Sequence, residues 1–317
     1  MARQKLGAQL IGMVLALAGC AESTPPVSQP VARPVVAEPV QPAFEASPES
    51  LALAAYFASV ESFYRTQGNL RTDGGGRDTP FDVRRITNAF LNIGFYNEFV
   101  SQGGTSVQKK SPATLTRWEG PLRVNVAFGQ FLNAAARARD HRATTTFLSR
   151  LEKLSGRAVT ESGLDTANVR VLFLNEDERR VALPDLQAFI GPVDPATLAA
   201  LRDPAKSTYC LALTVDANND RIIEKALVII RAETPDLLRL SCIHEELAQM
   251  MGLTNDDPAA RPSIFNDDEE FATLTRMDEY LLRILYDPRL SPGMSEAEGK
   301  GIVETIAAGL LASANGT

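Results

Sequence analysis

The stretch SCIHEELAQMMGLTND, residues 241–256, carries most of the information about the fold. Its apolar residues recur at helical spacing, and Gly252 is the residue type that commonly follows the end of a helix. Glu245 and Gln249 lie four residues apart, so they share one face of that helix. Glycine at 252 permits a sharp turn that can bring Asn255 back toward the same point. The segment therefore predicts three oxygen-bearing side chains that meet at one place.

The spacing resembles the zinc motif of the metzincin peptidases, His-Glu-x-x-His-x-x-Gly-x-x-His-Asp. The motif aligns, in order, with these residues of the chain: Glu245, Glu246, Gln249, Gly252, Asn255 and Asp256. The resemblance implies that Glu246 stands at the general-base position, and that Ser263 and Phe265 belong to the turn beneath the metal, with Phe265 in place of methionine. It also implies an α+β, zincin-like domain, in which a mixed sheet, a long helix and an active-site helix follow N-terminal helices.

The chemistry of the ligand positions departs from that of a zinc peptidase. The whole chain contains only His141 and His244, which excludes a site of three histidines within one chain. One carboxylate and two amides suit calcium or magnesium better than zinc. We therefore expect no zinc and no resident cofactor, with calcium or magnesium as the cations that these oxygens would accept. Two alternatives stay open at this point: a hydrogen-bond network in place of the metal, and a helix face that simply meets solvent.

Three longer sequence words, spread over residues 245–294, carry a second resemblance. The words are Glu-Glu-Leu-x-Gln-x-x-Gly-Leu-x-Asn-Asp, Ser-Ile-Phe-Asn-Asp and Leu-Leu-x-x-Leu-Tyr-Asp-Pro-Arg-Leu-x-x-Gly-Met. They resemble an uncharacterised bacterial family, a domain of unknown function found in exported proteins and lipoproteins. That family implies no particular activity.

Hydrophobic periodicity predicts the other elements. Apolar strands are expected at 122–126, 169–173, 209–215 and 222–230, and helices at about 53–64, 130–154 and 275–285. A further helix is predicted to begin at Thr79-Pro80 and to reach Phe99. These elements indicate one domain over residues 51–317, with an N-terminal helical extension at 51–116.

The N-terminus has the pattern of an export signal. Arg3 and Lys5 precede an apolar run that ends in Leu17-Ala18-Gly19-Cys20, which resembles the lipobox of bacterial lipoproteins. The resemblance implies a signal peptide at 1–19, a lipid on Cys20 and hence a membrane as partner. The proline-rich stretch 20–50 is typical of a tether. Ala21 in place of aspartate favours the outer membrane, facing the periplasm of a bacterial cell envelope.

Two further cysteines, Cys210 and Cys242, remain in the exported chain. An oxidising compartment allows them to pair, and we predict that they form a disulfide. The alternative is two buried free thiols.

The composition narrows the class of function. A formal charge of −7 disfavours non-specific nucleic-acid binding, so no nucleic-acid partner is expected. Residues 245–287 contain eleven acidic residues against three arginines, which could attract a cation or a basic peptide, or could form a solvated rim. We expect non-catalytic binding of a peptide or protein in the cell envelope. The alternatives are a metal-dependent hydrolase, with Glu246 as general base, and a structural envelope lipoprotein.

Overall fold

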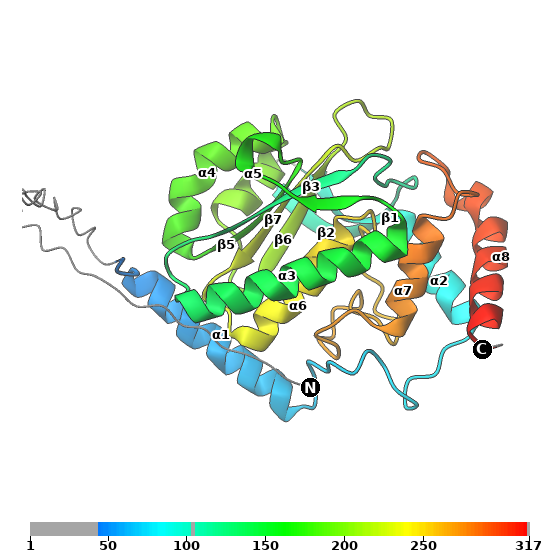
Figure 1. Ribbon diagram of the computed structural model, residues 1–317, viewed down its shortest axis with the longest axis horizontal. Coiled ribbons are helices and arrows are strands. Elements are labelled where there is room, and N and C mark those ends of the chain that lie inside the picture. Colours follow the sequence, from blue (N-terminus) through cyan, green and yellow to red (C-terminus); the bar gives the residue numbers. More distant parts are fainter. Residues whose placement is uncertain (1–43, 103–104, 316–317) are drawn as a thin grey trace, which may run out of the picture. The chain divides into compact units, whose positions relative to one another are not determined.

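The structure is a computed structural model that describes residues 44–102 and 105–315 (Figure 1). The expected signal peptide, Cys20 and most of the expected tether lie outside the described residues. Among the residues described, no helix combines the length and apolar character that crossing a membrane requires.

The described chain contains both helices and strands. The helices are α1 (Pro48–Thr66), α2 (Val83–Gly94), α3 (Ala134–Ser155), α4 (Glu176–Ile190), α5 (Pro195–Arg202), α6 (Asp236–Gln249), α7 (Arg276–Leu285) and α8 (Glu296–Asn315). The strands are β1 (Tyr96–Gln102), β2 (Thr105–Pro112), β3 (Leu122–Phe128), β4 (Val159–Glu161), β5 (Val169–Leu174), β6 (Cys210–Val215) and β7 (Lys225–Arg231).

A mixed five-stranded sheet forms the centre of the fold. Its strand order is β4-β3-β5-β7-β6, in which β6 alone runs antiparallel and occupies one edge. The two strands predicted at 209–215 and 222–230 are present as β6 and β7, which form an antiparallel pair. The presence of helices together with a mixed sheet confirms the predicted α+β class.

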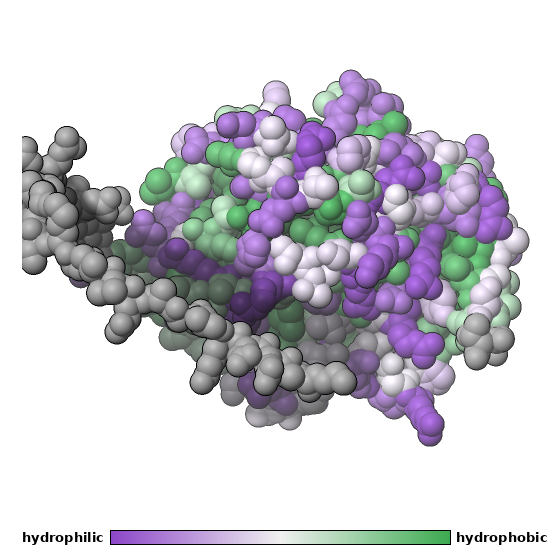
Figure 2. All heavy atoms as spheres, viewed as in Figure 1, coloured by the Kyte–Doolittle hydropathy of each residue, from purple (hydrophilic) through white to green (hydrophobic). Residues whose placement is uncertain are grey.

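Both faces of the sheet are covered, and alternate residues of its strands supply the two layers. Val171 and Phe173 of β5 face the main core, which includes side chains of α2, α3, α6, α7 and α8. Leu172 faces a second apolar layer beneath α4 and α5. Figure 1 shows α3 and α6 crossing one face while α4 and α5 lie on the other. In the view of Figure 2, polar residues are interspersed with apolar ones over the surface.

The segment before the sheet differs from the prediction in two places. Helix α2 begins at Val83, because the Asp82 side chain accepts a hydrogen bond from the Arg85 backbone N–H and so caps the helix there. The expected continuation to Phe99 is wrong, since β1 and β2 form an antiparallel hairpin instead. This hairpin contacts α5 but pairs with no strand of the five-stranded sheet.

Helix α1 contributes directly to the start of α6. The N-cap residue of α6, Pro235, has no side-chain acceptor for the first backbone N–H groups. Glu61 of α1 fills this role, since its Oε2 accepts hydrogen bonds of 3.0 Å from the N–H groups of Leu237 and Leu238. A carboxylate at a helix N-terminus also interacts favourably with the helix dipole.

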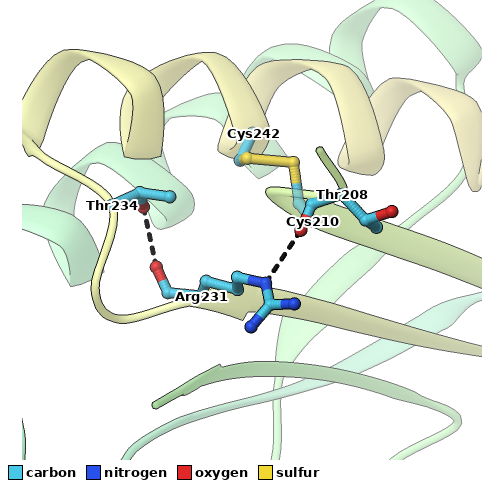
Figure 3. The surroundings of a disulfide bond; sticks show 5 residues. All are labelled: Thr208, Cys210, Arg231, Thr234 and Cys242. Carbon is cyan, nitrogen blue, oxygen red and sulfur yellow. Dashed lines mark hydrogen bonds between the residues drawn. A yellow bond between two sulfur atoms is a disulfide. The ribbon is translucent and has the colours of Figure 1, made fainter. Parts of the chain in front are cut away.

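The predicted disulfide is present and joins β6 to α6. The Cα atoms of Cys210 and Cys242 lie 5.8 Å apart, a separation within the usual range for a disulfide. Figure 3 shows the bond between the strand and the helix above it, with Arg231 of β7 donating to the carbonyl of Thr208 nearby. The covalent link fixes the edge strand beside the helix that carries the motif.

Candidate functional site

Helix α6 carries three of the motif residues, of which Glu245 and Gln249 lie away from its buried stripe. Ile243 and Leu247 are fully buried in the main core and fix the rotation of the helix. Glu245 and Gln249 are partly exposed, as expected from their spacing. Glu246 lies deeper, with only 5% of its surface exposed.

Glu246 is a buried carboxylate with an unsatisfied oxygen. Its Oε2 has no hydrogen-bond partner among the described residues. Burial, together with the charges of Asp256 and Glu98, raises its pKa. A hydrogen bond from the backbone of Ala212 in β6 offsets part of this increase in pKa. The carboxyl group therefore lies between the edge strand and other acidic side chains.

In the turn after α6, the side chains of Asn255 and Asp256 contact different parts of the fold. The φ angle of Gly252 is +118°, and the chain here passes close to the Thr116 backbone. The Asn255 amide then donates to the carbonyl of Asn92 in α2 at 2.9 Å, so this amide group is used to attach the turn to α2. Asp256 instead faces α6, where it accepts a hydrogen bond from Gln249.

Further carboxylates approach from two other segments. Glu98 comes from β1, while Asp267 and Glu269 come from the loop before α7. Hydrogen bonds of 2.7 Å from Leu70 N–H to Glu269 O, and of 2.8 Å from Arg71 N–H to Glu270 O, fix that loop against the segment after α1.

These residues interact electrostatically with one another. Together we refer to them as the acidic cluster: Glu98, Glu245, Glu246, Asp256, Asp267 and Glu269. Burial followed by the charge of Asp267 raises the pKa of Glu98 to about 7. Burial and neighbouring acids likewise raise the pKa values of Glu245, Asp256 and Glu269. Each charge therefore disfavours the next one, which is the condition in which a cation is most strongly attracted.

The turn that contains Ser263 and Phe265 has a structural role. Ser263 Oγ donates to Asp278 Oδ1 at 2.6 Å, and the Ile264 N–H donates to Asp278 Oδ2 at 3.1 Å. Asp278 also forms the predicted capping box with Thr275. Phe265 is fully buried in the main core.

His244 is held as a neutral ring. Its Nδ1 accepts a hydrogen bond from the Leu274 N–H at 3.1 Å, and its ring lies 4.0 Å from that of Phe147, centroid to centroid. Burial, and to a smaller degree the charge of Arg150, lowers its pKa to about 3. The side chain of His244 therefore has a structural role: it packs against Phe147 and accepts a hydrogen bond from Leu274.

Residues 83–305 match the model of a family that is described as a protein of unknown function, DUF2927. The chain belongs to the DUF2927 family. The expectation of an uncharacterised family is therefore confirmed, and the matched region contains the whole of the acidic cluster. No curated protein matches the sequence.

The donor atoms of the DUF2927 site define its chemistry. Carboxylate oxygens dominate it, and in the described part of the chain none of the acidic cluster forms an ion pair with arginine, lysine or histidine. Such a site can hold a hard cation or the charged end of a basic side chain. Its ligands are poorly suited to zinc, which prefers nitrogen and sulfur donors.

The sequence did not predict three members of the acidic cluster: Glu98, Asp267 and Glu269. Asp267 and Glu269 belong to a run of four acidic residues, 267–270. The sequence shows the charge of this run but does not show which residues it contacts. Glu98 gave no signal, because it lies about 150 residues before α6 and reaches the site only through the hairpin. The two described surface pockets lie elsewhere, one between α1 and α4 and the other between α2 and α8.

Proposed function

We propose that this protein is a bacterial envelope lipoprotein, anchored through Cys20, whose DUF2927 domain binds an extended peptide segment of a partner protein without hydrolysing it. The domain is proposed to be zincin-like, and the peptide to lie along the outer edge of β6. The location proposed is the outer membrane, facing the periplasm. The observation that carries the binding function is the outer edge of β6, which pairs with no strand among the described residues.

The arrangement of the elements supports the zincin-like ancestry. The long helix α3 and the motif helix α6 pack on the same face of a mixed sheet, and α6 follows the inner strand β7. Glu245 and Gln249 are both partly exposed on α6, which supports the alignment with the metzincin ligand positions.

The donor set supports a non-catalytic role. The aligned zinc positions hold a carboxylate and two amides, and the amide of Asn255 is used by α2. Without nitrogen ligands, a tightly bound zinc ion that lowers the pKa of water is not expected here.

The hydrogen-bonding phase of β6 supports its use as a docking edge. The Arg231 N–H donates to the carbonyl of Tyr209 at 3.0 Å, so the odd-numbered residues of this segment bond to β7. The backbone groups of Cys210, Ala212 and Thr214 therefore point to the outer edge, where the Ala212 N–H already donates to Glu246. Among the described strands, β6 pairs only with β7. An extended peptide can add to such an edge through main-chain hydrogen bonds.

Binding is tested with a phage library of random linear peptides, followed by affinity measurements on the enriched peptides. Thr214→Pro removes an outward N–H, and we expect it to weaken peptide binding roughly tenfold, as the loss of one hydrogen bond implies. Thr214→Val keeps the N–H and is expected to bind as the unaltered chain does. Equal binding by both variants would exclude the edge as the docking site.

The same experiment separates the other two functions. The buried carboxyl of Glu246, with its raised pKa, favours hydrolysis as the second candidate function. Cleavage of enriched peptides, detected by mass spectrometry and abolished in Glu246→Ala, would establish a hydrolase in place of a binding module. Failure of the folded protein to enrich any peptide would favour a structural role.

The lipid anchor is tested separately in a bacterial host. Cys20→Ala removes the thiol that the lipobox resemblance assigns to the lipid, so we expect loss of labelling by radioactive palmitate and release of the protein from the membrane fraction. The control is Ser28→Ala, which alters a polar tether residue and is expected to leave labelling unchanged. Undiminished labelling of Cys20→Ala would contradict the proposed anchor.

A further inference from the structure

Three carboxylates of the acidic cluster meet closely enough to share one ion. One oxygen each from Glu98, Asp256 and Asp267 lies within 4.8 Å of the other two. Oxygen atoms that bind one calcium ion at 2.3–2.6 Å stand at most about twice that distance apart, so the spacing fits a common cation. The three residues come from separate parts of the chain: β1, the turn after α6 and the loop before α7.

An independent observation points to a missing ligand at the same place. Glu246 is only 5% exposed, and its Oε2 has no hydrogen-bond partner among the described residues. Its carboxyl group lies close enough to Asp256 and Glu98 to interact with their charges. Asp256 Oδ1 is also buried without a partner. A buried charged group with an unused oxygen is costly unless a ligand satisfies it.

Three other buried acids of this protein are satisfied internally, whereas Glu233, like Glu246, has an oxygen without a partner among the described residues. Asp140 is paired with Arg239 at 2.6 Å, and Glu176 is paired with Arg231 at 2.8 Å. Asp278 accepts hydrogen bonds from Ser263 and from two backbone N–H groups. At the acidic cluster, one buried and several partly buried acids come together, and none of them forms an ion pair with a basic side chain among the described residues.

We infer that Glu98, Asp256 and Asp267 bind one hard divalent cation, calcium in preference to magnesium, beside the buried carboxyl group of Glu246. Calcium accepts irregular sets of six to eight oxygens, which suits ligands from separate segments. Magnesium requires near-ideal octahedral geometry at a shorter distance and is therefore disfavoured. Asp267 is exposed, so water can complete the coordination shell. This inference does not depend on the peptide-binding function.

The test is isothermal titration of the purified full-length chain, stripped with a chelator, with CaCl₂, MgCl₂ and ZnCl₂ in separate experiments. We expect one calcium ion per chain, with a Kd between about 1 µM and 1 mM, and weaker binding of the other two metals. Calcium at about 100 times Kd is expected to raise Tm by about 5 °C.

Two variants make the test specific. Asp267→Asn removes a charge at a position with φ of +58°, a conformation that asparagine adopts readily, so the loop should keep its shape. We expect it to weaken calcium binding at least tenfold, and Glu98→Gln to do the same. The matched control is Asp268→Asn, which changes a neighbouring acid outside the acidic cluster and should leave Kd unchanged.

Several outcomes would overturn the inference. Absence of calcium binding by folded protein would exclude the site, and equal loss in the Asp267 and Asp268 variants would reduce it to non-specific surface charge. Tighter magnesium than calcium binding would refute the selectivity. Binding of an oligolysine peptide instead of calcium, lost in Asp267→Asn, would assign the acidic cluster to a basic side chain of a partner.

Discussion

Replacing Asp140 with alanine is expected to lower the free energy of unfolding by about 3–5 kcal/mol, the cost of removing one member of a buried ion pair. Asp140 Oδ2 lies 2.6 Å from Nε of Arg239, and this pair joins α3 to α6. Both side chains are almost fully buried, so water cannot replace the lost carboxylate. Denaturation in guanidinium chloride, with the disulfide intact, measures the change.

Two further variants separate the buried pair from a general effect of losing an acid. Asp140→Leu combined with Arg239→Met removes both charges, and we expect it to recover most of the lost stability. Asp165→Ala removes an exposed acid and is expected to change stability by less than about 0.5 kcal/mol. Equal destabilisation by the double variant and by Asp140→Ala would contradict the proposed origin of the effect.

Gly252→Ala is expected to destabilise the fold by about 4 kcal/mol or more, because strain and overlap add at this position. A Cβ atom would stand 2.1 Å from the carbonyl oxygen of Thr116, which belongs to the backbone and cannot rotate away. The turn is also held by the preceding residues, since the carbonyls of Met250 and Met251 accept hydrogen bonds from Trp118 and Tyr286. We expect little folded protein, as measured by thermal unfolding and by yield.

Gly156→Ala is the matched control for this prediction. Gly156 also has positive φ, +67°, but an added Cβ would meet no atom within 4 Å. Its substitution isolates the conformational cost, which is about 1–2 kcal/mol. If the two alanine variants lose the same stability, the contact with Thr116 is not the reason that glycine is required at 252.

Much of the sheet could be predicted, because its strands are buried and strongly apolar. The strands at 122, 169, 209 and 222 all lie close to their expected places, and the disulfide joins the expected cysteines. The β1–β2 hairpin was missed because most of its residues are polar, so its sequence shows no clear alternation of apolar residues. Without a strand pattern in this segment, the preceding helix was predicted to continue as far as Phe99.

The candidate site was predicted only as far as a single helix determines it. The spacing of Glu245 and Gln249 settles that they share a face, since helix geometry is local. The direction of Asn255 depends on the turn and on a carbonyl of α2, and neither follows from spacing. Glu98 and Asp267 join the acidic cluster through contacts between distant segments, which one sequence does not reveal.

The carboxylate of Glu61 at the start of α6 has a consequence for where the folding unit begins. The family match starts at residue 83, yet the group that satisfies the first N–H groups of the motif helix belongs to α1. A fragment cut at the limits of the match would expose these donors and lose the strand-like contact of Arg71 with Phe271 next to the acidic loop. The region that matches the family model is thus smaller than the part of the chain that keeps the acidic cluster in place.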